Sequence, residues 1–176
     1  MSSDSYTILQ FLLDRANIQD TITSMTAFLD RRNWDGLTEH VLSKHEVTID
    51  FTQLYGGEIY KGPGAGQSEA WRVATESLTS WQHVTTGVLV DLPQPGEGVG
   101  VPHKVKASAN STVTLQRDGT MGDNMIQHGG IYTLELTRGS AGLGSANPWR
   151  VSYLHATPLW TKGNMEVVAN AFPKST

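Results

Sequence analysis

The sequence predicts an α+β fold in which a strongly bent, mostly antiparallel sheet wraps around N-terminal helices. Helical spacing of apolar residues dominates the first 45 positions, and strand-like alternation dominates the chain after residue 82. Helices followed by a run of strands are typical of the α+β class. The length of 176 residues suits one domain over 1–176 with a real hydrophobic core. A bent sheet of this kind is expected to leave a hollow at its wide end.

The N-terminal part is predicted to form three helices, of which 17–34 is the central one. Asn17 is its expected N-cap, and Asp30 follows its buried side directly, so this carboxylate can face whatever the helix covers. A shorter helix is expected over 5–15, and a third one is expected to begin with Asp35 as its N-cap. Four apolar residues of the central helix recur at steps of three and four: Ile18, Ile22, Met25 and Leu29.

The remaining chain is predicted to be mostly strands. Residues 46–51 alternate between apolar and polar side chains, a glycine-bracketed flexible loop follows over 55–66, and 67–80 returns to helical spacing. The inner face of the strand at 104–117 consists mostly of small residues, which leaves room for a ligand. Four further strands are expected, each bounded by Gly, Pro, Asn or Asp: 82–91, 104–117, 130–138 and 149–159.

Composition excludes several classes of function. A formal net charge of −4 and a pI of about 5.8 provide no basic surface for nucleic acid. The absence of cysteine excludes disulfides, thiolate zinc sites and cysteine nucleophiles. We find neither the layout of a signal peptide nor an apolar run of roughly 18 residues, so we expect a cytoplasmic protein that does not enter a membrane.

Local motifs exclude further chemistry. The glycines between 56 and 66 are not followed by Gly-Lys-Ser/Thr, so they do not indicate a phosphate-binding loop. No two histidines have the i, i+4 spacing of a helical metal site, and no carboxylate cluster accompanies them, so neither a metal nor another cofactor is expected. A nucleophile elbow of the Gly-x-Ser-x-Gly kind is also lacking.

Five dispersed motifs carry a resemblance to a known family. They are AFLDRRNWDGL at 27–37, VTIDF at 47–51, WQH at 81–83, GGIYTLELTR at 129–138 and WRVSYLHATPLWTKGN at 149–164. Together they resemble the SnoaL-like branch of the NTF2-like superfamily over roughly 15–165. The resemblance implies a cone-shaped domain that pairs as a homodimer through the open face of its sheet. The superfamily contains dehydratases, isomerases, cyclases, epoxide hydrolases and proteins that only bind or associate, so the reaction has to be argued from the site.

Within this branch the chain resembles scytalone dehydratase, and the resemblance identifies two catalytic positions. Asp30 corresponds to a pocket aspartate of that enzyme, and His83 to one of its two catalytic histidines. Other polar positions have changed, which implies different chemistry. The second histidine corresponds to Leu115, an asparagine to Tyr132, a serine to Gly130, and two tyrosines to Leu29 and Phe51.

Asp30 and His83 would form a chemically sensible dyad. A carboxylate that accepts a proton from one ring nitrogen fixes the tautomer and makes the other nitrogen a better base. In the alternative interpretation, Asp30 pairs with Arg31 or Arg32 and His83 is an ordinary strand histidine. Tyr132 is either a donor to a developing oxyanion or an amphipathic tyrosine of the sheet.

Eight more residues are predicted to contact a small hydrophobic substrate: Met25, Phe51, Tyr55, Trp71, Ser111, Leu115, Leu134 and Trp160. Tyr55 and Trp71 could form a lid over this ligand or simply cover the edge of the core. The other histidines are expected outside the site: His103 and His128 exposed in connections, and His155 pointing away from the hollow.

Two hypotheses of different classes follow. The first is a cofactor-independent lyase, isomerase or cyclase, in which His83, Asp30 and Tyr132 act on a polyketide, terpenoid or alkaloid intermediate of secondary metabolism. The second is a non-catalytic binding or assembly module whose hollow is a receptor or is filled by its own side chains. Epoxide hydrolysis would require an arginine and two carboxylates around one water, and the sequence offers only Asp30.

Overall fold

A computed structural model describes residues 5–139 and 146–169. Six strands form a single bent, unclosed sheet in the order β2-β1-β6-β5-β4-β3. All neighbouring pairs are antiparallel except β1 and β6, which are parallel. The strands are β1 (Val47–Asp50), β2 (Tyr60–Gly62), β3 (Ser80–Asp91), β4 (Lys104–Gln116), β5 (Met125–Arg138) and β6 (Trp149–Gly163). This arrangement confirms the predicted fold class.

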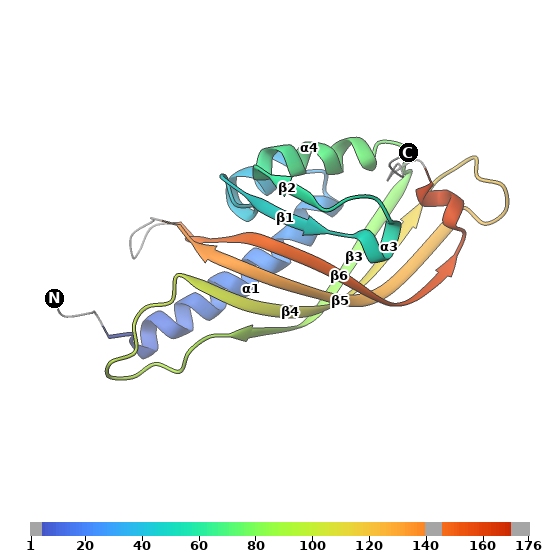
Figure 1. Ribbon diagram of the computed structural model, residues 1–176. Helices are drawn as coiled ribbons and strands as arrows, with labels where there is room; N and C mark the ends of the chain where they lie inside the picture. The colour runs from blue at the N-terminus through green and yellow to red at the C-terminus, as the bar shows by residue number, and fades with distance from the viewer. Residues whose placement is uncertain (1–4, 140–145, 170–176) are drawn as a thin grey trace.

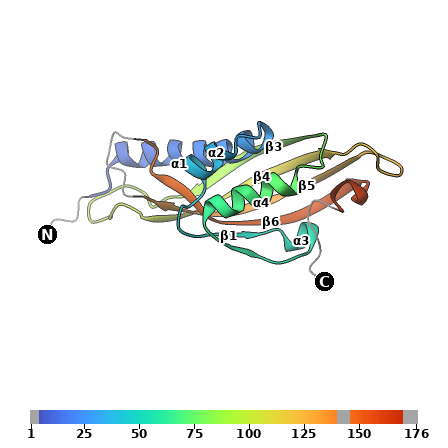
Figure 2. The same cartoon turned by 90° about the horizontal axis from the view of Figure 1, so that it is seen from above.

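Helices cover one face of the sheet and extend beyond its edge at β2. The long helix α1 packs on one face of the sheet, where it contacts β3 and β6. Helix α4 lies beside β1 and β2 (Figures 1 and 2). The helical elements are α1 (Ile8–Asp30), α2 (Trp34–Gly36), the π-helical turn η1 (Leu37–Val41), α3 (Thr52–Tyr55), α4 (Gly64–Ala74) and the 3-10 turn η2 (Met165–Val168).

Helix α1 is continuous, so the prediction of two separate helices over 5–15 and 17–34 was wrong. Thr7 caps its first turn, and the side chain of Gln10 bonds back to the Thr7 amide in a capping box. Asn17, the expected cap, lies in the helix interior, where its carbonyl accepts from Thr21 and Asn147. No glycine or proline separates the two predicted helices, so the favourable propagation of helical hydrogen bonds continues through this region.

Helix α1 is held against the sheet by the predicted apolar side and by one buried carboxylate. Ile18, Ile22, Met25 and Leu29 are all buried, as predicted. Asp14 is 3% exposed. It accepts hydrogen bonds from Tyr6 and Trp149 and forms an ion pair with Arg138 of β5. These contacts fix the helix axis and therefore the position of the last residue, Asp30.

The turn after α1 differs from the prediction. Asn33, not Asp35, caps the helix that follows, because its side-chain oxygen accepts from the Gly36 amide at 2.9 Å. Arg32 has a positive φ of 54°. Its guanidinium donates to the Leu78 carbonyl and lies 4.5 Å from the centre of the Trp81 ring. This turn is therefore tied to the start of β3.

The predicted strand and helix boundaries required correction in the second half. The segment at 55–66 was expected to be a flexible loop, but it starts at the last residue of α3 and contains β2. The helix expected over 67–80 is α4, which spans 64–74. Strand β5 begins at residue 125 instead of 130, and β6 continues to 163. The Gly129-Gly130 pair suggested a break, but both glycines remain paired across the sheet with only a register shift between them.

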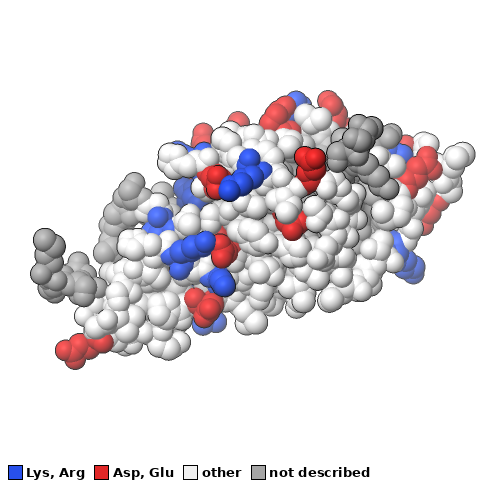
Figure 3. Space-filling view, in the orientation of Figure 1, with Lys and Arg blue, Asp and Glu red and all other residues white. Residues whose placement is uncertain are grey.

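The charged side chains on one face of the molecule are of mixed sign (Figure 3). Basic and acidic side chains are interspersed on the face shown in Figure 3, so this face presents no continuous basic surface. Among the helices described at 5–139 and 146–169, none combines the length and apolar character that crossing a membrane requires.

Candidate active site

The end of α1 and the middle of β3 bring Asp30 and His83 together. The Oδ1 atom of Asp30 lies 2.6 Å from Nδ1 of His83. An ionised carboxylate can only accept, so Nδ1 is the ring nitrogen that donates in this contact, and in a neutral imidazole Nε2 then carries the free lone pair. The Asp30 side chain is 22% exposed and that of His83 13%. This contact is the geometry that the dyad hypothesis requires.

The carboxylate of Asp30 is also fixed by the backbone of its partner strand. The amide of His83 donates to both carboxylate oxygens, at 3.1 and 3.0 Å. Arg32 is engaged with Leu78 and Trp81, and within the described chain no ion pair joins Asp30 to Arg31 or Arg32. The alternative interpretation of Asp30 as an arginine partner therefore finds no support in its contacts.

A narrow hollow lies beside the dyad between α1, α3, α4 and the sheet, with a volume of about 60 Å³. Apart from His83, Tyr55, Tyr132, Trp81 and Thr75, its wall is apolar. Five residues predicted to contact substrate line it: Met25, Phe51, Tyr55, Trp71 and Leu115. It is far smaller than the 300–1,000 Å³ or so of typical ligand sites, so a ligand must widen it.

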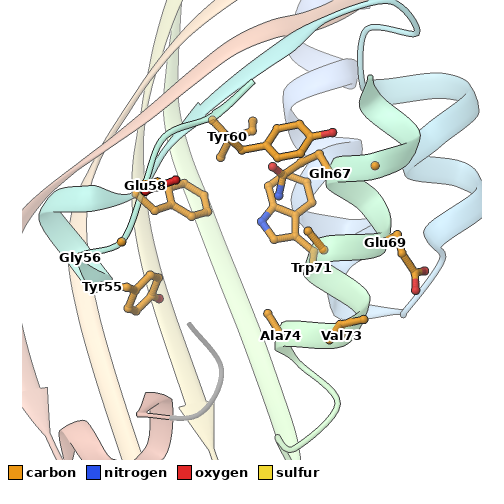
Figure 4. A pocket seen from close by; sticks show the side chains of 14 residues that line it. Tyr55, Gly56, Glu58, Tyr60, Gln67, Glu69, Trp71, Val73 and Ala74 are labelled. Carbon is orange, nitrogen blue, oxygen red and sulfur yellow. The ribbon is translucent and has the colours of Figure 1, made fainter. Parts of the chain in front are cut away.

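Two outer grooves flank this hollow. The α1–β3 groove has a volume of about 450 Å³ and is lined by both Asp30 and His83, which gives the dyad an opening to solvent. The α3–α4 groove has a volume of about 620 Å³ and shares Phe51, Tyr55 and Trp71 with the hollow (Figure 4). These three aromatic side chains therefore form a wall between the α3–α4 groove and the hollow.

His128 was predicted to be exposed in a connection, and this prediction was wrong. It lies in β5, is 4% exposed, and its Nε2 is 2.9 Å from the Tyr55 hydroxyl. The sheet register pairs His83 with Val113 and Val113 with His128, so the two histidines lie on one face of the sheet. The pKa of His128 is lowered to about 4. Burial is the main cause of this pKa shift, and the nearby His83 makes a smaller contribution to it.

Tyr132 points into the same region from β5 and is 7% exposed. Burial raises the pKa of its phenol, the neighbouring Ser111 hydroxyl opposes this rise, and the charge of Asp30 adds to it. Burial likewise raises the pKa of Tyr55. Both phenols therefore keep their protons at neutral pH and can donate hydrogen bonds.

Three residues predicted to contact substrate lie outside the lining of the hollow. Leu134 is fully buried in the core, where the register places it between Ala107 and Leu154. Trp160 is 45% exposed and covers Gly129, where a β-carbon would come within 2.2 Å of its ring. Ser111 lines a smaller cavity of about 20 Å³ beside Tyr132.

A second acid–histidine pair lies away from the hollow. Nδ1 of His155 in β6 is 3.0 Å from Oδ2 of Asp50 in β1. The hydroxyl of Thr52 donates to this carboxylate and is the main cause of the lowered pKa of Asp50. His155 was expected to point away from the hollow, and it is absent from the lining, whereas its neighbour Leu154 lines the hollow. The Asp50–His155 pair therefore has the same kind of contact as the Asp30–His83 dyad, but lies outside the candidate site.

Sequence reasoning missed His128, although a signal for it exists. Ile126, His128, Gly130 and Tyr132 alternate in phase along β5, so extension of the strand pattern through the glycines would have placed the histidine inward. Within 5–139 and 146–169, no group of three or more His, Asp or Glu side chains is arranged to hold a metal ion.

The sequence matches the SnoaL-like domain family over residues 10–155. No curated protein matches it significantly. Among solved structures, the Kfla4162 protein from Kribbella flavida is 20% identical, with 88% of this chain and 96% of that chain covered and a TM-score of 0.73.

Two similar structures have names that describe reactions. Hexachlorocyclohexane dehydrochlorinase LinA-type3 from Novosphingobium barchaimii LL02 is 20% identical, covering 89% of this chain and 93% of that chain with a TM-score of 0.66. A scytalone dehydratase-like protein from Novosphingobium aromaticivorans DSM 12444 is 8% identical, covering 86% and 87% with a TM-score of 0.63. At these identities the likeness shows a shared fold.

Proposed function

The chain belongs to the SnoaL-like domain family, and we propose that it is a cofactor-independent lyase that eliminates a small leaving group from a largely apolar substrate. The observation that carries the proposal is the 2.6 Å contact between Asp30 and Nδ1 of His83 at the wall of an apolar hollow. The names of two similar structures describe loss of HCl and of water, which are eliminations of the same kind.

His83 is the proposed base. Its Nε2 removes a proton from carbon, the C–H electron pair forms a C=C bond, and the leaving group departs from the neighbouring carbon with its bonding pair. Asp30 stabilises the imidazolium that results and keeps the ring in the reactive tautomer. The protein itself supplies only proton transfer and hydrogen bonds in this elimination, and no electron or group carrier takes part, so the proposal includes no cofactor.

Tyr132 is the proposed donor to the leaving oxygen or to a developing oxyanion. Its phenol is buried at the hollow and keeps its proton, so it can donate to an oxygen that gains negative charge. In a dehydration, the departing hydroxide takes this proton and leaves as water, and the proton held by His83 then restores the phenol through solvent. The origin of the substrate in polyketide, terpenoid or alkaloid metabolism stays a prediction from the family.

The small volume of the hollow requires that the substrate displace part of its wall. Phe51 and Trp71 are stacked, with ring centres 6.2 Å apart, and both also line the α3–α4 groove. Displacement of this stack would join the hollow to the groove and provide a space within the usual range for small-molecule sites.

Two probe substrates test the proposal. Hexachlorocyclohexane reports elimination through chloride release, and 4-hydroxy-4-phenylbutan-2-one reports dehydration through the absorbance of the conjugated enone. We expect turnover of at least one probe and a loss of about 100-fold or more in His83→Ala. His155→Ala, which removes the matched pair outside the hollow, should retain wild-type turnover. A folded His83→Ala protein with full activity would remove the dyad from the mechanism.

One observation favours a non-catalytic function as the second candidate. A hollow of about 60 Å³ is small for a substrate, as expected of a binding or assembly module whose hollow is filled by its own side chains. The two functions differ in outcome, because a non-catalytic module releases neither chloride nor enone from the two probes.

A further inference from the structure

The α3–α4 groove is a concave site with an aromatic lining. It has a volume of about 620 Å³ and lies between the segment that joins α3 to β2 and the helix α4 (Figure 4). The groove is lined by Ile49, Phe51, Tyr60, Ala70 and Trp71 on its apolar side. Its size falls within the usual range of sites for small molecules.

The Tyr60 ring is held in place by its neighbours, and Trp71 is buried beside it. Tyr60 packs so closely on Gly62 and Gly66 that a β-carbon at either position would come within 2.8 and 2.4 Å of its hydroxyl. The same hydroxyl donates to the Pro63 carbonyl at 2.8 Å. Trp71 is 4% exposed and stacks on Phe51. A ring held as Tyr60 is loses little conformational entropy when a ligand binds.

One polar group inside this lining lacks a partner. Gln67 is 4% exposed, and its Oε1 atom accepts no hydrogen bond from any residue of the described chain. A buried carbonyl oxygen left unsatisfied costs free energy, which a ligand that donates a hydrogen bond would recover. In Figure 4, Gln67 lies beside the rings of Tyr60 and Trp71.

The charge of the groove points to the same chemistry. Glu58 lies on the wall opposite α4, whereas the carboxylate of Glu69 points away from the groove (Figure 4). Glu69 instead receives two hydrogen bonds from Arg72, at 2.8 and 2.7 Å. Among residues 5–139 and 146–169, no lysine, arginine or histidine lines the groove. A carboxylate, an unpaired carbonyl and several aromatic faces all favour a cation that carries N–H donors.

We propose that the α3–α4 groove binds a small aromatic or apolar molecule through a protonated amine. The apolar body lies against Trp71 and Tyr60, and the ammonium group donates to Gln67 Oε1 and faces Glu58. Because Phe51 and Trp71 also form the wall of the hollow, the site places such a ligand next to the hollow that His83 lines. In this last respect the proposal rests on the proposed function, since it makes an amine-bearing molecule the substrate class.

Three matched probes test the site by titration into the ¹⁵N-labelled protein. 2-Phenylethylamine is cationic at neutral pH, 2-phenylethanol is neutral, and 3-phenylpropanoate is anionic. We expect the amine to bind with a dissociation constant on the order of 1 mM, as befits a ligand of about nine heavy atoms. The shifted signals should include the Trp71 indole and the Gln67 side-chain amide. The anion should bind at least about tenfold more weakly.

Two variants and one control separate the groups involved. Gln67→Leu should weaken amine binding about fivefold to tenfold through loss of the acceptor, and Glu58→Gln about threefold. Glu69→Gln removes the same charge from a carboxylate that points away, so amine affinity should stay unchanged. Two-dimensional amide spectra establish that each variant is folded.

Three results would overturn the proposal: equal affinity for the amine and the anion, no saturable amine binding up to about 20 mM, or shifts confined to the α1–β3 groove. The titration requires no turnover. Amine binding without elimination of any probe would therefore leave the site in place and contradict the proposed function, and elimination without amine binding would do the reverse.

Discussion

Replacing His128 by glutamine is expected to make the stability of the protein less sensitive to acid. The imidazole is 4% exposed, and its burial lowers its pKa to about 4 from the ordinary value of 6.5. The unfolded chain therefore binds a proton at a higher pH than the folded chain does. The stability that this site contributes is present above pH 6.5 and is lost as pH falls toward the folded pKa.

The size of the effect follows from the two pKa values. Each pH unit in which only the unfolded state is protonated costs about 1.4 kcal/mol, so His128 alone should remove about 2 kcal/mol of stability between pH 7 and pH 5. A glutamine side chain can reach the position of Nε2 and keep a hydrogen bond with the Tyr55 hydroxyl, but it does not titrate.

Urea denaturation at pH 7.0 and pH 5.0 measures this difference. Carboxylates titrate in both proteins, so their contribution cancels when the pH-dependent loss of the variant is subtracted from that of the wild type. We expect a remaining difference of about 2 kcal/mol. Equal losses in the two proteins, or a histidine signal in NMR spectra that titrates near pH 6.5 for His128, would refute the assignment of a buried neutral imidazole.

Three further substitutions test other parts of the structure. Asp14→Ala should lower the free energy of unfolding by about 3–5 kcal/mol in a denaturant titration, because it leaves a guanidinium and two donors without their buried acceptor. In the same assay Glu69→Ala, which removes an exposed carboxylate, should leave the midpoint nearly unchanged. Thr7→Ala should cost about 1 kcal/mol through loss of the helix cap, again measured with urea; an unchanged midpoint would contradict the capping role. Tyr132→Phe should reduce turnover of the β-hydroxy ketone probe about 10-fold to 100-fold while the protein stays folded, and wild-type rates would exclude the phenol as a donor.

The sequence predicted the features that depend on strong periodicity. The buried side of α1 and the small inner face of β4 follow directly from spacing, because a side chain on the wrong face would expose apolar surface. The resemblance supplied Asp30 and His83 as a pair, which spacing alone could not, since 53 residues separate them along the chain.

The errors arose where local signals competed with tertiary structure. Asn17 is a competent N-cap, but nothing before it stops a helix, and the Thr7 capping box began the helix ten residues earlier. Gly129 and Gly130 suggest a break, but Trp160 covers the first and the backbone of Thr157 packs on the second, so the strand continues through both. His128 was misplaced for this reason, because its burial depends on that continuation.

The central claim is that Asp30 acts through His83, and a double-mutant cycle tests it most directly. The rate of elimination is measured for the wild type, Asp30→Asn, His83→Ala and the double variant. We predict that Asp30→Asn loses about 100-fold to 10,000-fold, and that the double variant is no slower than His83→Ala alone, since the aspartate has no role without its imidazole. Losses that multiply in the double variant, or full activity in Asp30→Asn, would contradict the account.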